Sequence, residues 1–104
     1  MATTSKTLAR TAAATSNATL YTVPTTGTTT VVTDIVVTNT AGSSGTFTLN
    51  LDGTAVLSGV AIPANSSVFF SLKQVLQANA TPKTITGSAS AITINFHISG
   101  VEIV

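Results

Sequence analysis

The residues that could carry out acid–base or nucleophilic chemistry are few and dispersed along this sequence. His97 is the one histidine, and the acidic residues are Asp34, Asp52 and Glu102. Nucleophilic catalysis needs a histidine beside an activated serine or threonine, and an acid that orients the histidine. The many hydroxyl residues form no nucleophile-elbow motif. We therefore expect that the protein is not an enzyme and that His97 has a structural or interface role.

The same residues provide no recognisable ligand set for a metal ion or a cofactor. One imidazole and three separated carboxylates have none of the spacings of zinc or calcium sites. The sequence has no cysteine, which excludes disulfide bonds and thiolate ligands. We expect no catalytic, cofactor-binding or metal site within one copy, and a site assembled from several copies stays open.

The surface of this protein must be short of charge. Charged residues make up 7% of the 104 residues, against about a quarter in ordinary soluble domains, and threonine supplies about a fifth of the chain. Neutral hydroxyl surfaces repel one another weakly, which favours assembly with other copies or other proteins. The formal net charge is only +1 and the basic residues are scattered, so nucleic acid is not expected as a partner.

Apolar runs in the sequence are short. The first residues contain Lys6 and Arg10 but no following apolar run of the length that a signal peptide needs. No stretch approaches the roughly 20 apolar residues of a membrane span. We expect a protein that is made and used without secretion and without a membrane partner.

The chain divides into two parts by its pattern. Residues 1–18 are small and polar, with Leu8 as the sizeable aliphatic residue, and show no period of 2 or 3.6. They carry two basic residues and no acid, which predicts a flexible N-terminal arm that becomes ordered on a neighbouring subunit or partner surface. A frayed terminus is the alternative. Residues 19–104 have the length and hydrophobic content of a single domain.

Within this domain, apolar residues alternate with threonine, serine and asparagine in short segments separated by turns. The segment 46–51 is the clearest case, and Asp52-Gly53 matches a two-residue hairpin turn. Seven or eight short strands predict an antiparallel β-sandwich, either jelly-roll or immunoglobulin-like, and the strand order stays open. The expected inner faces include Phe47, Leu49, Phe70, Ile94 and Phe96.

Two local features are less regular. Residues 73–80, which contain Val75 and Leu76, could form a turn of helix. In the last expected strand, 92–104, Gly100 interrupts the alternation and the apolar residues resume with the opposite parity. We expect a bulge at Gly100.

The segment 30–39 is apolar on both faces, which favours a strand with the core on one side and a contact surface on the other. Phe69 lies on the face opposite the expected core and would be covered by a loop or available to a partner. Together with the arm, these outer faces give the expected contact residues, which are Lys6, Leu8, Arg10, Val32, Val36 and Phe69.

Longer stretches resemble a module that is common in structural proteins of tailed bacteriophages. The matching features are LYTVP, VVTDIVVTNT, VAIPANSSVFF and the closing ASAITINFHISGVEIV. They cover residues 20–104, which is nearly all of the expected sandwich. The resemblance implies a β-sandwich unit that self-associates, often as a trimer.

The resemblance also implies a role in the virion. Because the whole chain is this module with an arm, we expect a capsid decoration (cement) protein that binds the major capsid protein on the capsid surface and stabilises the shell. It would be made in the host cytoplasm. A tail, collar or fibre-associated virion protein is the alternative. A host-surface carbohydrate-binding module is a third reading, but aromatic residues at 5% and the lack of tryptophan argue against aromatic sugar platforms.

Overall fold

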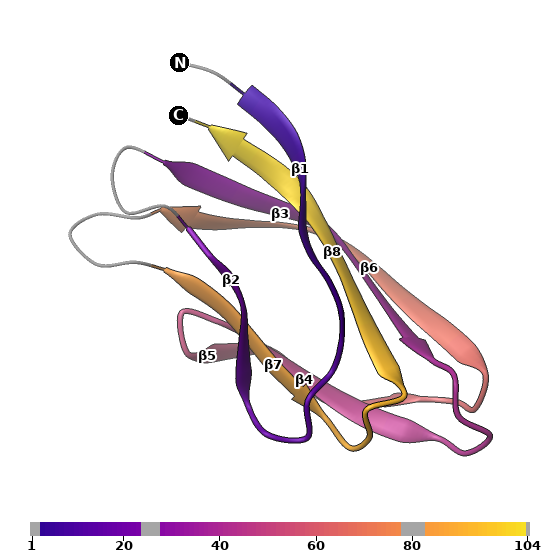
Figure 1. The fold of residues 1–104 in the computed structure, drawn as a ribbon. Coiled ribbons are helices and arrows are strands. Elements are labelled where there is room, and N and C mark those ends of the chain that lie inside the picture. The colour runs from indigo at the N-terminus through magenta and orange to yellow at the C-terminus, as the bar shows by residue number, and fades with distance from the viewer. Residues whose placement is uncertain (1–2, 24–27, 78–82, 104) are drawn as a thin grey trace.

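The structure is a computed structural model that describes residues 3–23, 28–77 and 83–103, and these residues form eight strands (Figure 1). The strands are β1 (Thr3–Ala12), β2 (Ala18–Thr22), β3 (Thr29–Asn39), β4 (Gly45–Leu51), β5 (Thr54–Ile62), β6 (Ser66–Gln77), β7 (Thr84–Ala89) and β8 (Ile94–Ile103). They alternate apolar and hydroxyl residues, a pattern that suits a sheet with one face in a core. The expected all-β fold is confirmed.

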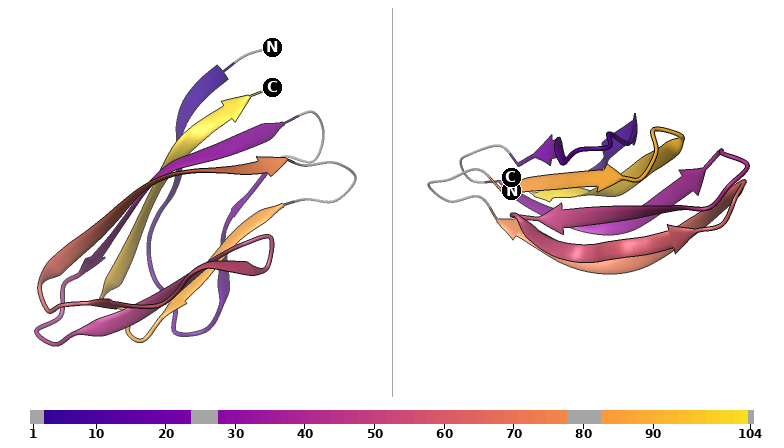
Figure 2. Two further views of the ribbon diagram at one scale, coloured as in Figure 1. Left: turned by 180° about the vertical axis from the view of Figure 1, so that it is seen from behind. Right: turned by 90° about the horizontal axis from the view of Figure 1, so that it is seen from below.

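The strands form two antiparallel sheets of four, in the orders β1-β8-β3-β6 and β2-β7-β4-β5. Figure 2 shows these sheets as two facing layers. The antiparallel strand pairs are nested in sequence: β1 pairs with β8, β2 with β7, β3 with β6 and β4 with β5. This strand order distinguishes between the two expected sandwiches, because nested pairs divided between two four-stranded sheets make a jelly roll.

The core lies between the two sheets and contains the residues expected there. Phe47, Leu49, Ile94 and Phe96 are fully buried, and Phe70 packs against them while partly exposed. The ring of Phe47 in one sheet meets Phe96 in the other edge-on, with the ring centroids 5.9 Å apart. Asp52 and Gly53 both have positive φ angles, 54° and 79°, as the expected hairpin turn requires.

The first strand corrects the expected domain boundary. Residues 3–12 form β1, which pairs with β8 along its whole length. Leu8, Ala9 and Ala13 are buried in the core cluster. These residues belong to the sandwich and are not an arm apart from it, and Met1 and Ala2 lie outside the described residues. An edge strand buries few side chains, which is why β1 shows no clear period.

The expected bulge at Gly100 was wrong, because β8 keeps its alternation and the neighbouring strands carry the extra residues. Thr7 pairs with Ser99 but Ala9 pairs with Ile98, so Leu8 is the additional residue of β1. Gly100 meets a different requirement, since a Cβ atom there would clash with the carbonyl oxygen of Val31. The glycine allows β3 and β8 to approach closely.

Two further expectations are corrected. The strand β6 continues to Gln77, so residues 73–77 form no helical turn, and 78–80 lie outside the described residues. The last strand begins at Ile94, which leaves Ile92 exposed before it, and Val104 lies outside the described residues.

Candidate functional site: an assembly surface

The six expected contact residues divide into exposed and buried ones. Arg10 and Phe69 are exposed, and Val36 is partly exposed on the outer face of the β1-β8-β3-β6 sheet. Lys6 is also exposed, and its ammonium forms an ion pair near the end of the sheet. Leu8 and Val32 are 6% and 0% exposed and belong to the core. The expectation that these two residues contact a partner is therefore wrong.

The cause of the error at Val32 is a bulge in the middle of β3. Val32 pairs with Gly100 of β8, whereas Asp34 pairs with the adjacent Ser99, so β3 has one extra residue, Thr33. An extra residue reverses the alternation of the side chains. Val32 therefore points inward, as Ile35 and Val37 do, while Val36 points outward.

One row of outward side chains crosses all four strands of this sheet. Arg10 of β1 pairs with His97 of β8, His97 pairs with Val36 of β3, and Val36 pairs with Phe69 of β6. Directly opposed residues on one face have Cβ atoms about 5 Å apart. The fold thus brings three of the expected contact residues into one row with His97. Phe69, at one end of the row, is 77% exposed.

A second row lies further along the same face and is more apolar. It contains Ser5, Val101, Val31 and Val75, which are paired in that order across the sheet. Val75 is 60% exposed. Ile103, which pairs with Thr29, extends the apolar area toward the end of β8. Sequence reasoning missed these residues, and the parity change after Gly100 was the signal that Val101 and Ile103 face outward.

The middle row, between these two, is polar. It contains Thr7, Ser99, Asp34 and Ser71. Asp34 is exposed, and its carboxylate accepts hydrogen bonds from the hydroxyls of Thr33 at 3.2 Å and Ser71 at 3.5 Å. Lys73 borders the same shallow hollow. We call the three rows with Ile103 the apolar sheet face.

The outer face of the other sheet has a different composition. Thr46, Thr48 and Asn50 of β4 alternate with buried residues, and β7 adds Thr84, Thr86 and Ser88 in the same way. Asn50 donates hydrogen bonds to the side chains of Asn17 and Thr86. The four strands of this sheet contain no charged residue. We call this surface the hydroxyl face.

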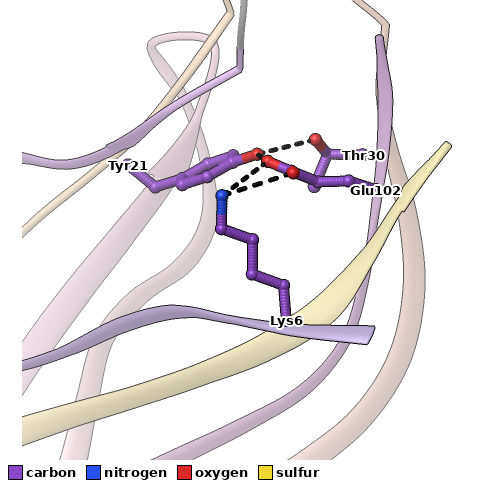
Figure 3. Close-up of polar contacts among 4 residues, drawn as sticks. All are labelled: Lys6, Tyr21, Thr30 and Glu102. Atoms are coloured by element: carbon purple, nitrogen blue, oxygen red, sulfur yellow. Dashed lines mark hydrogen bonds and ion pairs between the residues drawn. The ribbon is translucent and has the colours of Figure 1, made fainter. Parts of the chain in front are cut away.

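A polar cluster lies at the end of the sandwich near the two termini (Figure 3). The hydroxyl of Tyr21 on β2 donates to Glu102 on β8 and lies 2.9 Å from the hydroxyl of Thr30 on β3. The Lys6 ammonium on β1 lies 3.3 Å from both carboxylate oxygens of Glu102. Three strands from both sheets, β1, β2 and β8, therefore meet at one carboxylate, and β3 joins them through the hydroxyl of Tyr21.

The electrostatics of this cluster fit a structural role. Burial and the hydrogen bond to Glu102 raise the pKa of Tyr21 to about 12, so the phenol stays protonated and is a weaker acid than an ordinary tyrosine. The hydrogen bond from Tyr21, followed by those from Lys6, lowers the pKa of Glu102 below its usual value. The Glu102 side chain is 13% exposed. The groups satisfy one another and tie β1 and β2 together.

We expect acid to weaken the contacts of Glu102 with Tyr21 and Lys6. The pKa of Glu102 is lower in the folded than in the unfolded protein. The ionised carboxylate therefore stabilises the fold at pH values above the unfolded-state pKa, and this stabilisation is lost as the pH falls through the folded-state pKa. Between pH 7 and pH 3 the wild type should lose about 1 kcal/mol more unfolding free energy than Glu102→Gln. Denaturant unfolding at each pH measures this, and parallel curves for the two proteins would contradict it.

At alkaline pH, the stability that Tyr21 contributes should fall as the pH rises, and a variant of Tyr21 tests this. The folded pKa of Tyr21 lies above its ordinary value of 10.0, so its contribution is complete below that value and is lost as the pH rises through about 12. Tyr21→Phe should remove this alkaline dependence, and because it also removes the hydrogen bond that lowers the pKa of Glu102, it should reduce the acid dependence as well.

Within the described residues, no group of three or more histidine and acidic side chains could hold a metal ion. The same part of the chain has no helix that is long and apolar enough to cross a membrane.

Comparison with known proteins identifies the fold. No protein-family model matches the sequence, and no curated protein matches it significantly. A similar solved structure is a chain of the T13 IBDV viral particle, with a TM-score of 0.58 and 11% sequence identity over 97% of this chain. The two chains share a fold. This chain spans 30% of the length of the viral chain, and at this identity the likeness concerns the fold alone.

Proposed function

We propose that this protein is a structural component of a bacteriophage virion, a capsid decoration (cement) protein that binds the major capsid protein and stabilises the shell. The observation that supports this most is the contrast between its two outer faces, one apolar and one of neutral hydroxyl and amide groups. A jelly roll shared with a chain of a viral particle fits this role. The protein would be located on the capsid surface.

The contrast between the faces suits a protein whose apolar side is covered in the assembled particle and whose other side is exposed. Exposed apolar residues on a small monomer indicate a contact surface. Threonine, serine and asparagine side chains remain solvated without strong charge, so that side can face water. Homo-oligomers, with a trimer as the expected form, would bind a repetitive shell through several contacts at once.

The proposal assigns no catalytic activity and no cofactor to the chain. The groups with the most altered acidity, Tyr21 and Glu102, bind each other and Lys6. A phenol that stays protonated and a carboxylate that stays ionised are poor proton-transfer groups near neutral pH. Their role in this proposal is to hold the fold together.

Adding the purified protein to capsids that lack a decoration layer should raise the temperature at which the shells rupture. Phe69→Ser should bind fewer copies per shell and protect the shells less, because it removes the most exposed aromatic side chain of the apolar sheet face. Thr48→Ser on the hydroxyl face is the control and should behave as the wild type. Electron microscopy and light scattering measure occupancy and rupture.

The same experiment distinguishes the alternatives. If the wild type does not bind capsids but binds isolated tails, the decoration role is wrong and a tail, collar or fibre role replaces it. If it binds neither but binds host-cell polysaccharide, the carbohydrate-binding reading is correct.

A further inference from the structure

We propose that copies of this chain associate through the apolar sheet face, with Arg10 of one copy paired to Asp34 of the next. This deepens the homo-oligomer in the proposed function and rests on that part of it alone. It does not depend on where the oligomer binds.

The first argument is the chemistry of the face. The two outward rows that flank the row of Asp34 each contain apolar side chains from neighbouring strands. Phe69 and Val75 on β6 are among the most exposed large apolar residues of the described chain. The hydroxyl face has no comparable apolar rows. Burial of apolar area therefore favours contact through the apolar sheet face.

The second argument is that the strand edges are poorly suited to pairing between copies. The outer strands β1, β2, β5 and β6 all contain register shifts, and β6 carries Lys73. Bulges and lysines on edge strands hinder hydrogen bonding to another chain. The outer face of the sheet is the more favourable contact.

The third argument is charge complementarity. The apolar sheet face carries an exposed cation, Arg10, and an exposed anion, Asp34, on strands that are separated by β8. The ion pair found within the described residues is that of Lys6 with Glu102, so both groups lack an ionic partner there. A second copy supplies the missing partner to each. The planar guanidinium can bind a carboxylate through two hydrogen bonds.

The fourth argument is area. Four strands about 4.8 Å apart and about ten residues long give a face of roughly 19 by 33 Å, or about 600 Å² in projection. A standard protein interface buries about 800 Å² of accessible surface per partner, and accessible area exceeds projected area. The face is thus large enough for a stable contact, and Phe69 at its edge can pack against the neighbouring copy.

The test uses two charge-reversed variants, Arg10→Asp and Asp34→Arg, studied alone and as a mixture by sedimentation velocity at tens of micromolar. Each variant alone should associate about tenfold more weakly than the wild type, because like charges meet at the contact. In the mixture, the introduced carboxylate of one variant meets the introduced guanidinium of the other, so mixed oligomers should form. The double variant Arg10→Asp/Asp34→Arg should regain association close to the wild type.

General charge attraction is controlled by moving the same changes to the hydroxyl face. Thr19→Asp/Thr46→Asp and Thr19→Lys/Thr46→Lys alter the net charge by the same amounts, and mixing them should give no gain. Circular dichroism verifies that all variants are folded, since both original positions are exposed.

The outcomes separate the two proposals. A monomeric wild type, a mixture that behaves as the average of its components, or an equal gain in the control mixture would overturn this inference. So would unchanged association of Phe69→Ser. If association follows the charge pair but no particle binds the oligomer, the self-association surface stands and the decoration role fails.

Discussion

Phe96→Ala is expected to lower the free energy of unfolding by about 3–5 kcal/mol. Phe96 is completely buried, on the inner face of β8, and its ring contacts Phe47 of the opposite sheet edge-on. Truncation removes apolar contacts between the two layers and leaves a cavity that a closely packed sandwich cannot refill. Equilibrium denaturation with urea or guanidinium measures the loss.

The neighbouring residue provides the matched control. His97 lies on the outer face, in the row between Arg10 and Val36, so His97→Ala should change the stability by about 0.5 kcal/mol or less. In a strand, adjacent side chains point to opposite faces, and a register slip of one residue would exchange them. A larger loss from His97→Ala than from Phe96→Ala would show that β8 has the opposite orientation.

Leu8→Ala is expected to cost about 2–5 kcal/mol, which tests whether the first residues belong to the fold. Leu8 is 6% exposed, and its side chain fills the space above Gly100, where a Cβ atom would lie 2.9 Å from a Leu8 methyl group. Its removal leaves a cavity under the edge strand. The same denaturation measurement applies.

Ser5→Ala is the control for this second prediction, because Ser5 is exposed on the same strand and should cost about 0.5 kcal/mol or less. Equal, small effects of both changes would mean that residues 1–18 are a frayed arm in solution.

If Leu8→Ala is costly and Ser5→Ala is not, β1 is part of the fold. A protein shortened to begin at Ala18 then lacks the strand that pairs with β8 and should be strongly destabilised. Loss of capsid binding by such a shortened protein would therefore not show that residues 1–18 contact the capsid.

Much of the fold was predictable from local pattern. A period of two is a property of the strand itself, so Phe47, Leu49, Ile94 and Phe96 could be assigned to the core without knowledge of their partners. The hairpin at Asp52 and Gly53 was equally local, because its backbone angles are ones that these residue types tolerate. The resemblance to phage structural modules added an expected role, which stays a proposal.

The contact surface was only half predictable. Phe69 was expected on the face opposite the core because of its position in the alternation, and its exposure confirms that it lies on the outer face. Val32 was misplaced because the bulge at Thr33 is visible only against the residues of β8 with which β3 pairs. No pattern within β3 marks the extra residue, since both of its faces are rich in valine and threonine.

The sequence alone determined the class of fold, the main core residues and the shortage of charge, because these depend on residue type and on spacing within a strand. The tertiary structure decided the jelly-roll strand order, the inclusion of β1, and the meeting of Tyr21, Lys6 and Glu102. It also aligned Arg10, His97, Val36 and Phe69 in one row. These features depend on hydrogen bonds between strands that are distant in the sequence, and the register of such pairs is fixed by the packing of the whole sandwich.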